Sequence, residues 1–182
     1  AYSGDIIELK DGDLFVNKRH VPLPYTAKTV YELRSTVVIE DLEELLIPYG
    51  EQIQRKGDTI IYQVGLSEKQ AAEFRQRKPA VLSVRRSRYD YQVADSFFAR
   101  SSANDHWSSD NYGPLKIPSP GDTVEITAGN YKLYKNIPGI AVGKHPVTEK
   151  LYFLLGDNRN GAEDSRYMGL VPHSKMYGIV KK

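Results

Sequence analysis

The hydrophobic and polar positions of the chain mostly follow the alternation that is typical of β-strands. The segments with this pattern, or with a short apolar run of strand length, are residues 4–9, 13–17, 25–38, 59–64, 80–91, 123–126, 149–155 and 176–180. Asp11-Gly12 can supply the positive φ of a tight turn, so residues 4–17 are predicted to form a β-hairpin. Gly4-Asp5 and Gly121-Asp122 are predicted to be turns at which strands begin. The number of short strands predicts a mainly β fold.

Helical spacing is confined to two short segments. Residues 40–46 place three leucines on one side of a helix, which is enough for one or two turns. Ser67 and Gln70 have the spacing of a capping box, which predicts a helix from there to about Arg77. Residues 129–146 are rich in glycine and proline and follow neither pattern. We therefore expect only a few short helices.

Composition is that of an ordinary globular protein. The 182 residues support one domain with room for a sub-domain, and 26% of them are charged while 40% are hydrophobic. The net charge is only +2, and the densest basic cluster is Arg85, Arg86 and Arg88 at the charged end of a predicted strand. We interpret this cluster as solvated surface and expect no nucleic-acid partner.

The residues that are absent or isolated exclude several kinds of chemistry. With no cysteine, the chain can have no disulfide, thiolate nucleophile or zinc–thiolate site. The histidines, at positions 20, 106, 145 and 173, show none of the paired spacings that metal sites use. No apolar run approaches the ~18 residues that a membrane-spanning helix needs. We expect no metal, no cofactor and a soluble piece of protein.

One motif carries chemical information. The apolar segment Leu151–Leu155 runs directly into Gly156–Pro172, which reads G-D-N-R-x4-D-S-R-x2-G-x-V-P. The whole pattern resembles the last signature segment of the type I signal peptidases (the S26 family, or leader peptidases), which are serine–lysine endopeptidases. Two weaker similarities accompany it. Ala1–Asp5 is similar to the family's G-x-P-G-D turn, with Ser3 at the proline, and residues 110–134 resemble the long inserts of some bacterial members.

The spacing within the signature predicts how its charged residues pair. Residues two apart in an extended chain share a face, so Asp157 can pair with Arg159 and Asp164 with Arg166. The resemblance implies that these pairs support an active site by pinning the loop beside a catalytic lysine. The alternative is that they are ion pairs that hold a β-turn and have no chemical role.

The remaining signature positions also have expected roles. We expect Asn158 and Ser165 to form hydrogen bonds with the backbone rather than with substrate. Ala162 stands where the family usually has a serine that orients the lysine, and one lost hydrogen bond would slow such an enzyme by about tenfold. The candidate residues for active-site support are therefore Asp157, Asn158, Arg159, Ala162, Asp164, Ser165 and Arg166.

The resemblance assigns no catalytic residue to this chain. In the family, the nucleophilic serine of S-M-x-P and the basic lysine of K-R both precede the G-x-P-G-D turn, so both would lie before Ala1. Within the chain, Ser174-Lys175 is predicted to be a surface turn, and Ser67 with Lys69 belongs to a helix start. The chain by itself is therefore expected to be inactive.

Two hypotheses about the parent protein follow. The first is a signal peptidase that removes signal peptides from exported pre-proteins, anchored at the outer, periplasmic face of a bacterial inner membrane by a segment absent from this chain. The second is a catalytically dead homologue that binds peptides or proteins, which Ala162, Ser3 and Ala1 favour. The resemblance implies a β-sheet core built from residues 1–9 and 149–182, and a large β-rich insert at residues 10–148. An apolar surface where the missing strands belong would favour self-association.

Overall fold

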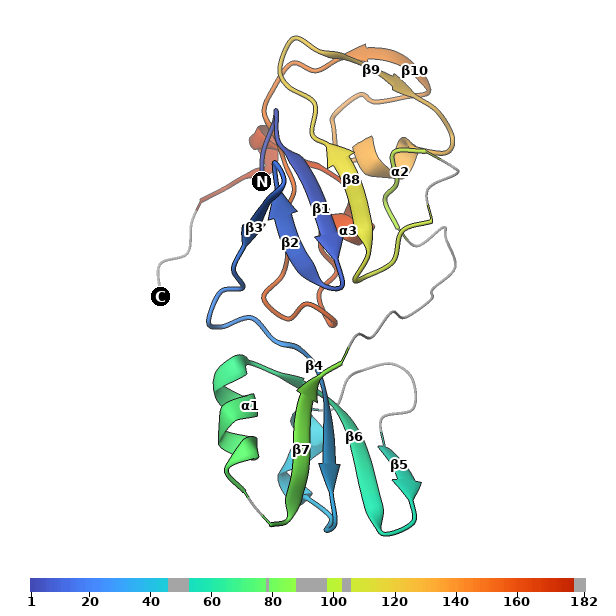
Figure 1. Ribbon diagram of the computed structural model, residues 1–182. Helices are drawn as coiled ribbons and strands as arrows, with labels where there is room; N and C mark the ends of the chain where they lie inside the picture. The colour runs from blue at the N-terminus through green and yellow to red at the C-terminus, as the bar shows by residue number, and fades with distance from the viewer. Residues whose placement is uncertain (46–52, 78, 88–97, 103–105, 179–182) are drawn as a thin grey trace. The chain divides into compact units, whose positions relative to one another are not determined.

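A computed structural model describes residues 1–45, 53–77, 79–87, 98–102 and 106–178 (Figure 1). It confirms a mainly β fold, with antiparallel sheets and short helices. The chain forms two compact units: unit 1 consists of residues 1–22, 92–155 and 163–182, and unit 2 of residues 23–91 and 156–162. The units thus divide the chain at other positions than the predicted core and insert. Which residues form an insert relative to the family stays a prediction.

Unit 1 contains a four-stranded sheet in the order β3-β2-β1-β8. Its strands are β1 (Ile6–Lys10), β2 (Asp13–Val16), β3 (Arg19–Val21) and β8 (Tyr112–Lys116). Strands β1 and β2 form the predicted hairpin, and Asp11 and Gly12 have φ of 51° and 80°, as a type I′ turn requires. The sequence pattern did not predict β3, a wholly exposed strand at the edge of the sheet.

The rest of unit 1 consists of two two-stranded sheets and short helical turns. These elements are β9 (Thr123–Ile126), α2 (Tyr131–Tyr134), β10 (Gly143–Pro146), β11 (Leu151–Tyr152), α3 (Ser165–Met168), β12 (Val171–Pro172) and η3 (His173–Lys175). The apolar run 149–155 is thus a much shorter strand than predicted. The predicted strand 176–180 is wrong for Met176–Gly178, which are exposed and have no strand structure, and its last two residues lie outside the described part of the chain.

Both predicted Gly-Asp turns are confirmed, and the two turns have the same pattern of hydrogen bonds. In each, the aspartate carboxylate accepts a hydrogen bond from the backbone N–H three residues earlier, at 3.0 Å from Tyr2 to Asp5 and 2.9 Å from Ser119 to Asp122. The aspartate N–H donates in return to the carbonyl of that earlier residue. The intervening glycines have φ of 94° and 95°, so each turn closes without strain before β1 or β9 begins.

Unit 1 has one continuous hydrophobic core beneath these elements. Aromatic rings run through it in a chain, with ring centroids 4.4 Å apart between Trp107 and Tyr112 and 5.4 Å apart between Tyr112 and Phe153. Trp107 is the only tryptophan of the protein. Its fluorescence therefore reports on unit 1 alone.

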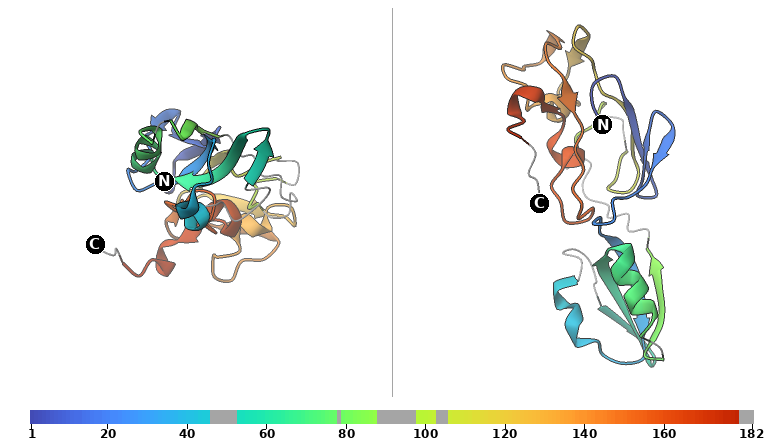
Figure 2. Two further views of the ribbon diagram at one scale, coloured as in Figure 1. Left: turned by 90° about the horizontal axis from the view of Figure 1, so that it is seen from below. Right: turned by 90° about the vertical axis from the view of Figure 1, so that its left-hand side faces the viewer.

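Unit 2 is a four-stranded antiparallel sheet with helices on one face (Figures 1 and 2). The strand order is β5-β6-β4-β7, and the elements are β4 (Thr29–Ser35), η1 (Glu40–Leu45), β5 (Ile53–Lys56), β6 (Thr59–Leu66), α1 (Glu68–Arg75) and β7 (Val81–Arg86). The core packs Leu42 of η1 and Phe74 of α1 against side chains of β4, β6 and β7. The capping box of Ser67 and Gln70 is confirmed. Both predicted helices exist, the first as a 3₁₀ helix.

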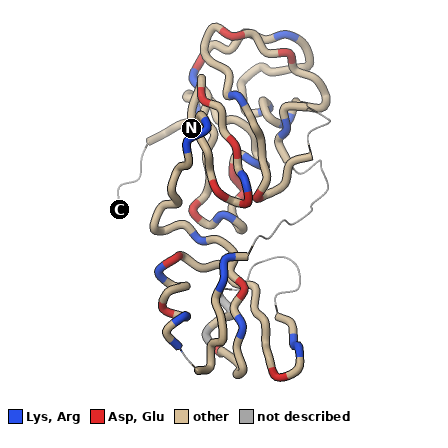
Figure 3. The backbone as a smooth tube through the Cα atoms, in the orientation of Figure 1, with Lys and Arg blue, Asp and Glu red and all other residues tan. Residues whose placement is uncertain are grey.

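Charge and helix length place few further constraints on the fold. Lys and Arg are interspersed with Asp and Glu in both units (Figure 3). None of the helices in the described residues is both long and apolar enough to cross a bilayer. In the same part of the chain, no group of histidine and carboxylate side chains could hold a metal ion.

Candidate functional site

The Asp-Ser-Arg part of the signature forms a buried ion pair in unit 1. Arg166 donates to Asp164 through two atoms, at 2.9 Å from Nε to Oδ1 and 2.8 Å from Nη2 to Oδ2, so the predicted pair is confirmed. Arg166 is 1% exposed and Asp164 is 6% exposed. Asp164 is also the N-cap of α3, because its carboxylate accepts a hydrogen bond from the Arg166 N–H.

The surroundings of Arg166 favour its charged form. Burial tends to lower the pKa of the guanidinium, but the hydrogen bonds and charge of Asp164, aided by Tyr167 and Asp110, outweigh burial and hold that pKa above its usual value. Nη1 donates to the carbonyl of Ser109 at 2.9 Å. The pair is therefore a fixed structural charge pair, since no proton leaves an arginine with a raised pKa at any physiological pH.

Ser165 ties this turn to the segment that follows β11. Its N–H donates to the Leu154 carbonyl at 3.0 Å, and its Oγ accepts from the Leu154 N–H at 2.9 Å. The side chain is completely buried. The prediction that Ser165 bonds to the backbone is thus confirmed, and α3 is held rigidly at the end of the strand.

The first residues of the chain lie beside the same strand. Ala1 and Phe153 exchange backbone hydrogen bonds, with 3.0 Å from Phe153 N to Ala1 O and 3.3 Å in the other direction. Ser3, which stands at the family's proline position, accepts from the Leu151 N–H through Oγ at 2.8 Å. The segment Ala1–Ser3 therefore runs antiparallel to Leu151–Phe153 and extends the β11–β12 pair by one strand.

The first half of the signature belongs to unit 2. Lys28 and Asn158 form a parallel bridge, with 2.7 Å from Lys28 N to Asp157 O and 3.0 Å from Arg159 N to Lys28 O. The exposed Asp157 carboxylate accepts a hydrogen bond from Thr26 Oγ1 at 2.5 Å. Among the described residues no ion pair joins Asp157 to Arg159, so this predicted pair is wrong: the bridge to Lys28 holds the loop instead.

A turn follows the bridge and contains the position at which the family's serine is expected. The carbonyl of Asn158 accepts hydrogen bonds from the N–H groups of Gly161 and Ala162, at 3.1 and 2.9 Å. A Cβ on Gly161 would lie 2.6 Å from the Asn158 side-chain nitrogen, so only glycine fits there without a shift. Ala162 is partly exposed. A serine at this position would present its hydroxyl at the surface of the turn.

Residues that the sequence did not single out also hold the signature in place. They include Thr26 and Lys28, which bind its first half, Ala99 and Ser109, whose main-chain groups bond to Arg166, and Asn136, whose amide donates to the Met168 and Leu170 carbonyls. Lys28, Ala99 and Ser109 act through backbone atoms, which leave no trace in the residue pattern. Thr26 could not be chosen among many surface threonines without knowledge of the fold.

Comparison with known proteins identifies the family. The buried Asp-Ser-Arg turn is formed by the segment that resembles the last signature of the type I signal peptidases. The sequence model of the family "Signal peptidase, peptidase S26" matches residues 1–182, so the chain belongs to this family. No solved structure matches the chain.

Curated relatives match over shorter segments. The "Probable signal peptidase I-2" of Synechocystis is 35% identical over 71 residues, which cover 34% of this chain and 33% of the relative. The "Signal peptidase I" of Aquifex aeolicus is 38% identical over 64 residues, covering 35% of this chain and 24% of the relative. That of Buchnera aphidicola is 37% identical over 57 residues, covering 31% of this chain and 17% of the relative. The matched segments span a third or less of these relatives.

Proposed function

We propose that this chain is the part of a signal peptidase I that builds one wall of a serine–lysine active site. The protein that contains it would remove signal peptides from exported pre-proteins at the outer face of a bacterial inner membrane. The nucleophilic serine and the basic lysine would come from segments that precede Ala1. Curated relatives named signal peptidase I, and the intact signature, support this proposal.

The pairing of Ala1–Ser3 with Leu151–Phe153 is the observation that carries the proposal. Residues that preceded Ala1 would continue along the same strand past Leu154, the residue that Ser165 holds by two hydrogen bonds. In the family, the lysine comes shortly before the turn that corresponds to Ala1–Asp5. A lysine there would lie beside the Asp-Ser-Arg turn, against a rigid and largely buried wall.

Such a wall suits the chemistry that a lysine base requires. A free lysine has a pKa of ~10.4 and is protonated near neutral pH, so it can accept the serine proton only if burial lowers its pKa by several units. Asp164 would raise that pKa if its charge were free. Because Arg166 neutralises Asp164 within a bidentate pair, this pair adds no net charge to the wall. We therefore assign a positioning role, and no direct chemical one, to Asp164, Ser165 and Arg166.

The first experiment is a cleavage assay on the complete parent protein in detergent or vesicles. The substrate is a pre-protein with small residues at both recognition positions of a small-x-small site. We expect the parent to cleave it and the chain Ala1–Lys182 alone to leave it intact. A folded, membrane-inserted parent that leaves the substrate intact would overturn the proposal.

Ala162 stands where the family usually has a serine. This difference favours a second candidate, a catalytically dead homologue that binds extended peptides. This candidate predicts a parent that lacks the serine or the lysine and binds signal peptides without cutting them. Titration of a signal peptide into the parent distinguishes the two, since the enzyme returns two products and the binding protein returns the peptide unchanged. Ala162→Ser would accelerate only the enzyme, by about tenfold.

A further inference from the structure

Unit 2 contains an apolar pocket that is separate from the signature. The pocket has a volume of about 280 Å³ and lies between η1 and the sheet. Side chains that line it include Val38, Leu42, Ile53 and Tyr62. Val38 is 60% exposed and Ile53 is 47% exposed, so the apolar lining continues out to the surface. A pocket of this volume accommodates one or two large apolar side chains, since it lies at the small end of ligand sites.

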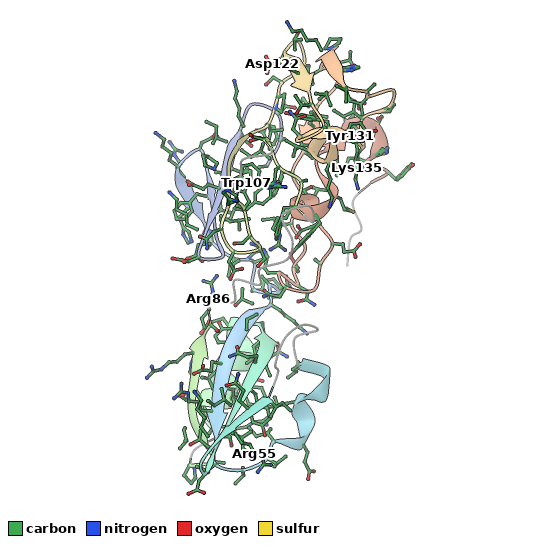
Figure 4. The ribbon with its side chains drawn as sticks, turned by 90° about the vertical axis from the view of Figure 1, so that its right-hand side faces the viewer. Arg55, Arg86, Trp107, Asp122, Tyr131 and Lys135 are labelled. Carbon is green, nitrogen blue, oxygen red and sulfur yellow. The ribbon has the colours of Figure 1, made fainter. Side chains whose placement is uncertain are left out.

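The pocket opens beside the outer edge of strand β5. Among the described residues, β5 pairs with β6 alone and is the last strand of its sheet. Figure 4 looks onto this edge, with η1 beside the sheet and Arg55 labelled at its lower end. Ile53 and Arg55 both line the pocket, as residues two apart on one strand must when they share a face. A strand added outside β5 would therefore place alternate side chains at the mouth of the pocket.

The charges at this edge specify what such a strand carries. Arg55 is exposed and forms no ion pair with any residue that the structure describes. Within β5 the charged residues are Arg55 and Lys56, both positive. Glu40 also lines the pocket, but from η1 and not from the strand edge. The residue opposite Arg55 in an added strand would thus be acidic, and the residue opposite Ile53 would be apolar.

The geometry points to β5 as a docking edge for an extended peptide segment of another protein, in which an apolar and an acidic residue stand two positions apart. The peptide adds a fifth strand to the unit 2 sheet by main-chain hydrogen bonds, and its apolar side chain enters the pocket. This inference goes beyond peptide-bond cleavage and does not depend on it. A failure of the cleavage assay would leave it untouched.

The test uses the 182-residue chain and short labelled peptides, rich in threonine, that differ only in the central residues. The probe peptide carries leucine and glutamate two positions apart. One control peptide has lysine in place of glutamate, and another has leucine and glutamate adjacent, which puts them on opposite faces of a strand. Fluorescence anisotropy measures binding, and amide chemical shifts of Ile53–Lys56 locate it. We expect saturable binding of the probe peptide and shifts at β5.

Reversing the charge of Arg55 and comparing peptides of opposite charge distinguishes a loss of binding from a loss of folding. We expect Arg55→Glu to weaken the probe peptide about tenfold, because a cross-strand attraction becomes a repulsion, and to favour the lysine peptide instead. The matched control is Arg85→Glu in β7, the opposite edge of the same sheet, which should leave binding unchanged.

Three results would overturn the inference. They are no saturable binding of the probe peptide, equal effects of the two arginine substitutions, and a dimer in sedimentation that Arg55→Glu dissociates. The last result would assign the edge to a second copy of this chain.

Discussion

The buried Asp164–Arg166 pair should be a large contributor to the stability of unit 1. Arg166→Met keeps most of the side-chain volume but removes both guanidinium hydrogen bonds to Asp164 and the one to the Ser109 carbonyl; the backbone N–H of residue 166 still donates to Asp164. With Asp164 only 6% exposed, its carboxylate would remain buried without the Arg166 guanidinium. Breaking one side of such a pair costs about 3–5 kcal/mol of unfolding free energy.

Urea unfolding followed by Trp107 fluorescence measures this loss in unit 1. With a slope of about 1–3 kcal/mol per molar urea, a loss of about 3–5 kcal/mol lowers the midpoint by about 1–5 M. The double variant Asp164→Asn/Arg166→Met also removes the buried carboxylate charge, and asparagine can still cap α3. We expect the double variant to recover about 1–3 kcal/mol relative to Arg166→Met. A loss below ~1 kcal/mol for Arg166→Met, or a double variant weaker than the single one, would refute the reasoning.

Three further substitutions test the local structure. Gly169→Ala should destabilise unit 1 by about 3 kcal/mol, because a Cβ at this position, where φ is 88°, would lie 2.4 Å from the Lys132 carbonyl oxygen. The control is Gly139→Ala, since Gly139 has a φ of 72° but open space around it. Equal losses of stability in the two variants would contradict the prediction. Ser67→Ala should lower the stability of α1 by about 1 kcal/mol, measured by hydrogen exchange of its amides, and an unchanged exchange rate would show that the cap is dispensable. Hydrogen bonds from Tyr31 and then Arg75 lower the pKa of Glu68 below its usual value of about 4.5. The stabilisation of α1 by these bonds should therefore be full above pH ~4.5 and lost as the pH falls through the lowered pKa of Glu68. Glu68→Gln should remove this acid dependence in the same exchange experiment, and a variant that keeps it would rule out Glu68 as its source.

The sequence predicted the parts of the fold that short-range chemistry determines. Asp11-Gly12 specifies its turn within two residues, and Ser67 with Gln70 specifies a helix start within four, so both predictions are confirmed. Strand β5 was missed because Ile53 is its only apolar residue, and an edge strand needs no alternation. The strand predicted after Pro172 is wrong because an apolar alternation forms a strand only where a partner strand is available, and Met176–Gly178 have none among the described residues.

The site shows the same division between local and distant interactions. The Asp164–Arg166 pair has the predicted spacing of two, but it forms at the N-terminus of α3, with Asp164 as the N-cap, and not on one face of an extended chain as predicted. The same spacing misled at Asp157, whose carboxylate binds Thr26, 131 positions away in the chain. Asp157 is exposed and bound to Thr26 whereas Arg159 is buried, so the spacing of two does not bring these two side chains together.

Burial distinguishes the signature residues that the fold requires from the residue that folding does not constrain. Arg166 is 1% exposed, so a chain that buries it must also keep Asp164, whether or not the protein cleaves a peptide bond. Ser165 is likewise required, because it satisfies both main-chain groups of Leu154. An enzyme and a dead homologue would therefore retain these three residues alike. Ala162 is different, since it is partly exposed and no side-chain hydrogen bond of the turn depends on it. Ala162→Ser is therefore expected to test the proposed activity with little effect on folding.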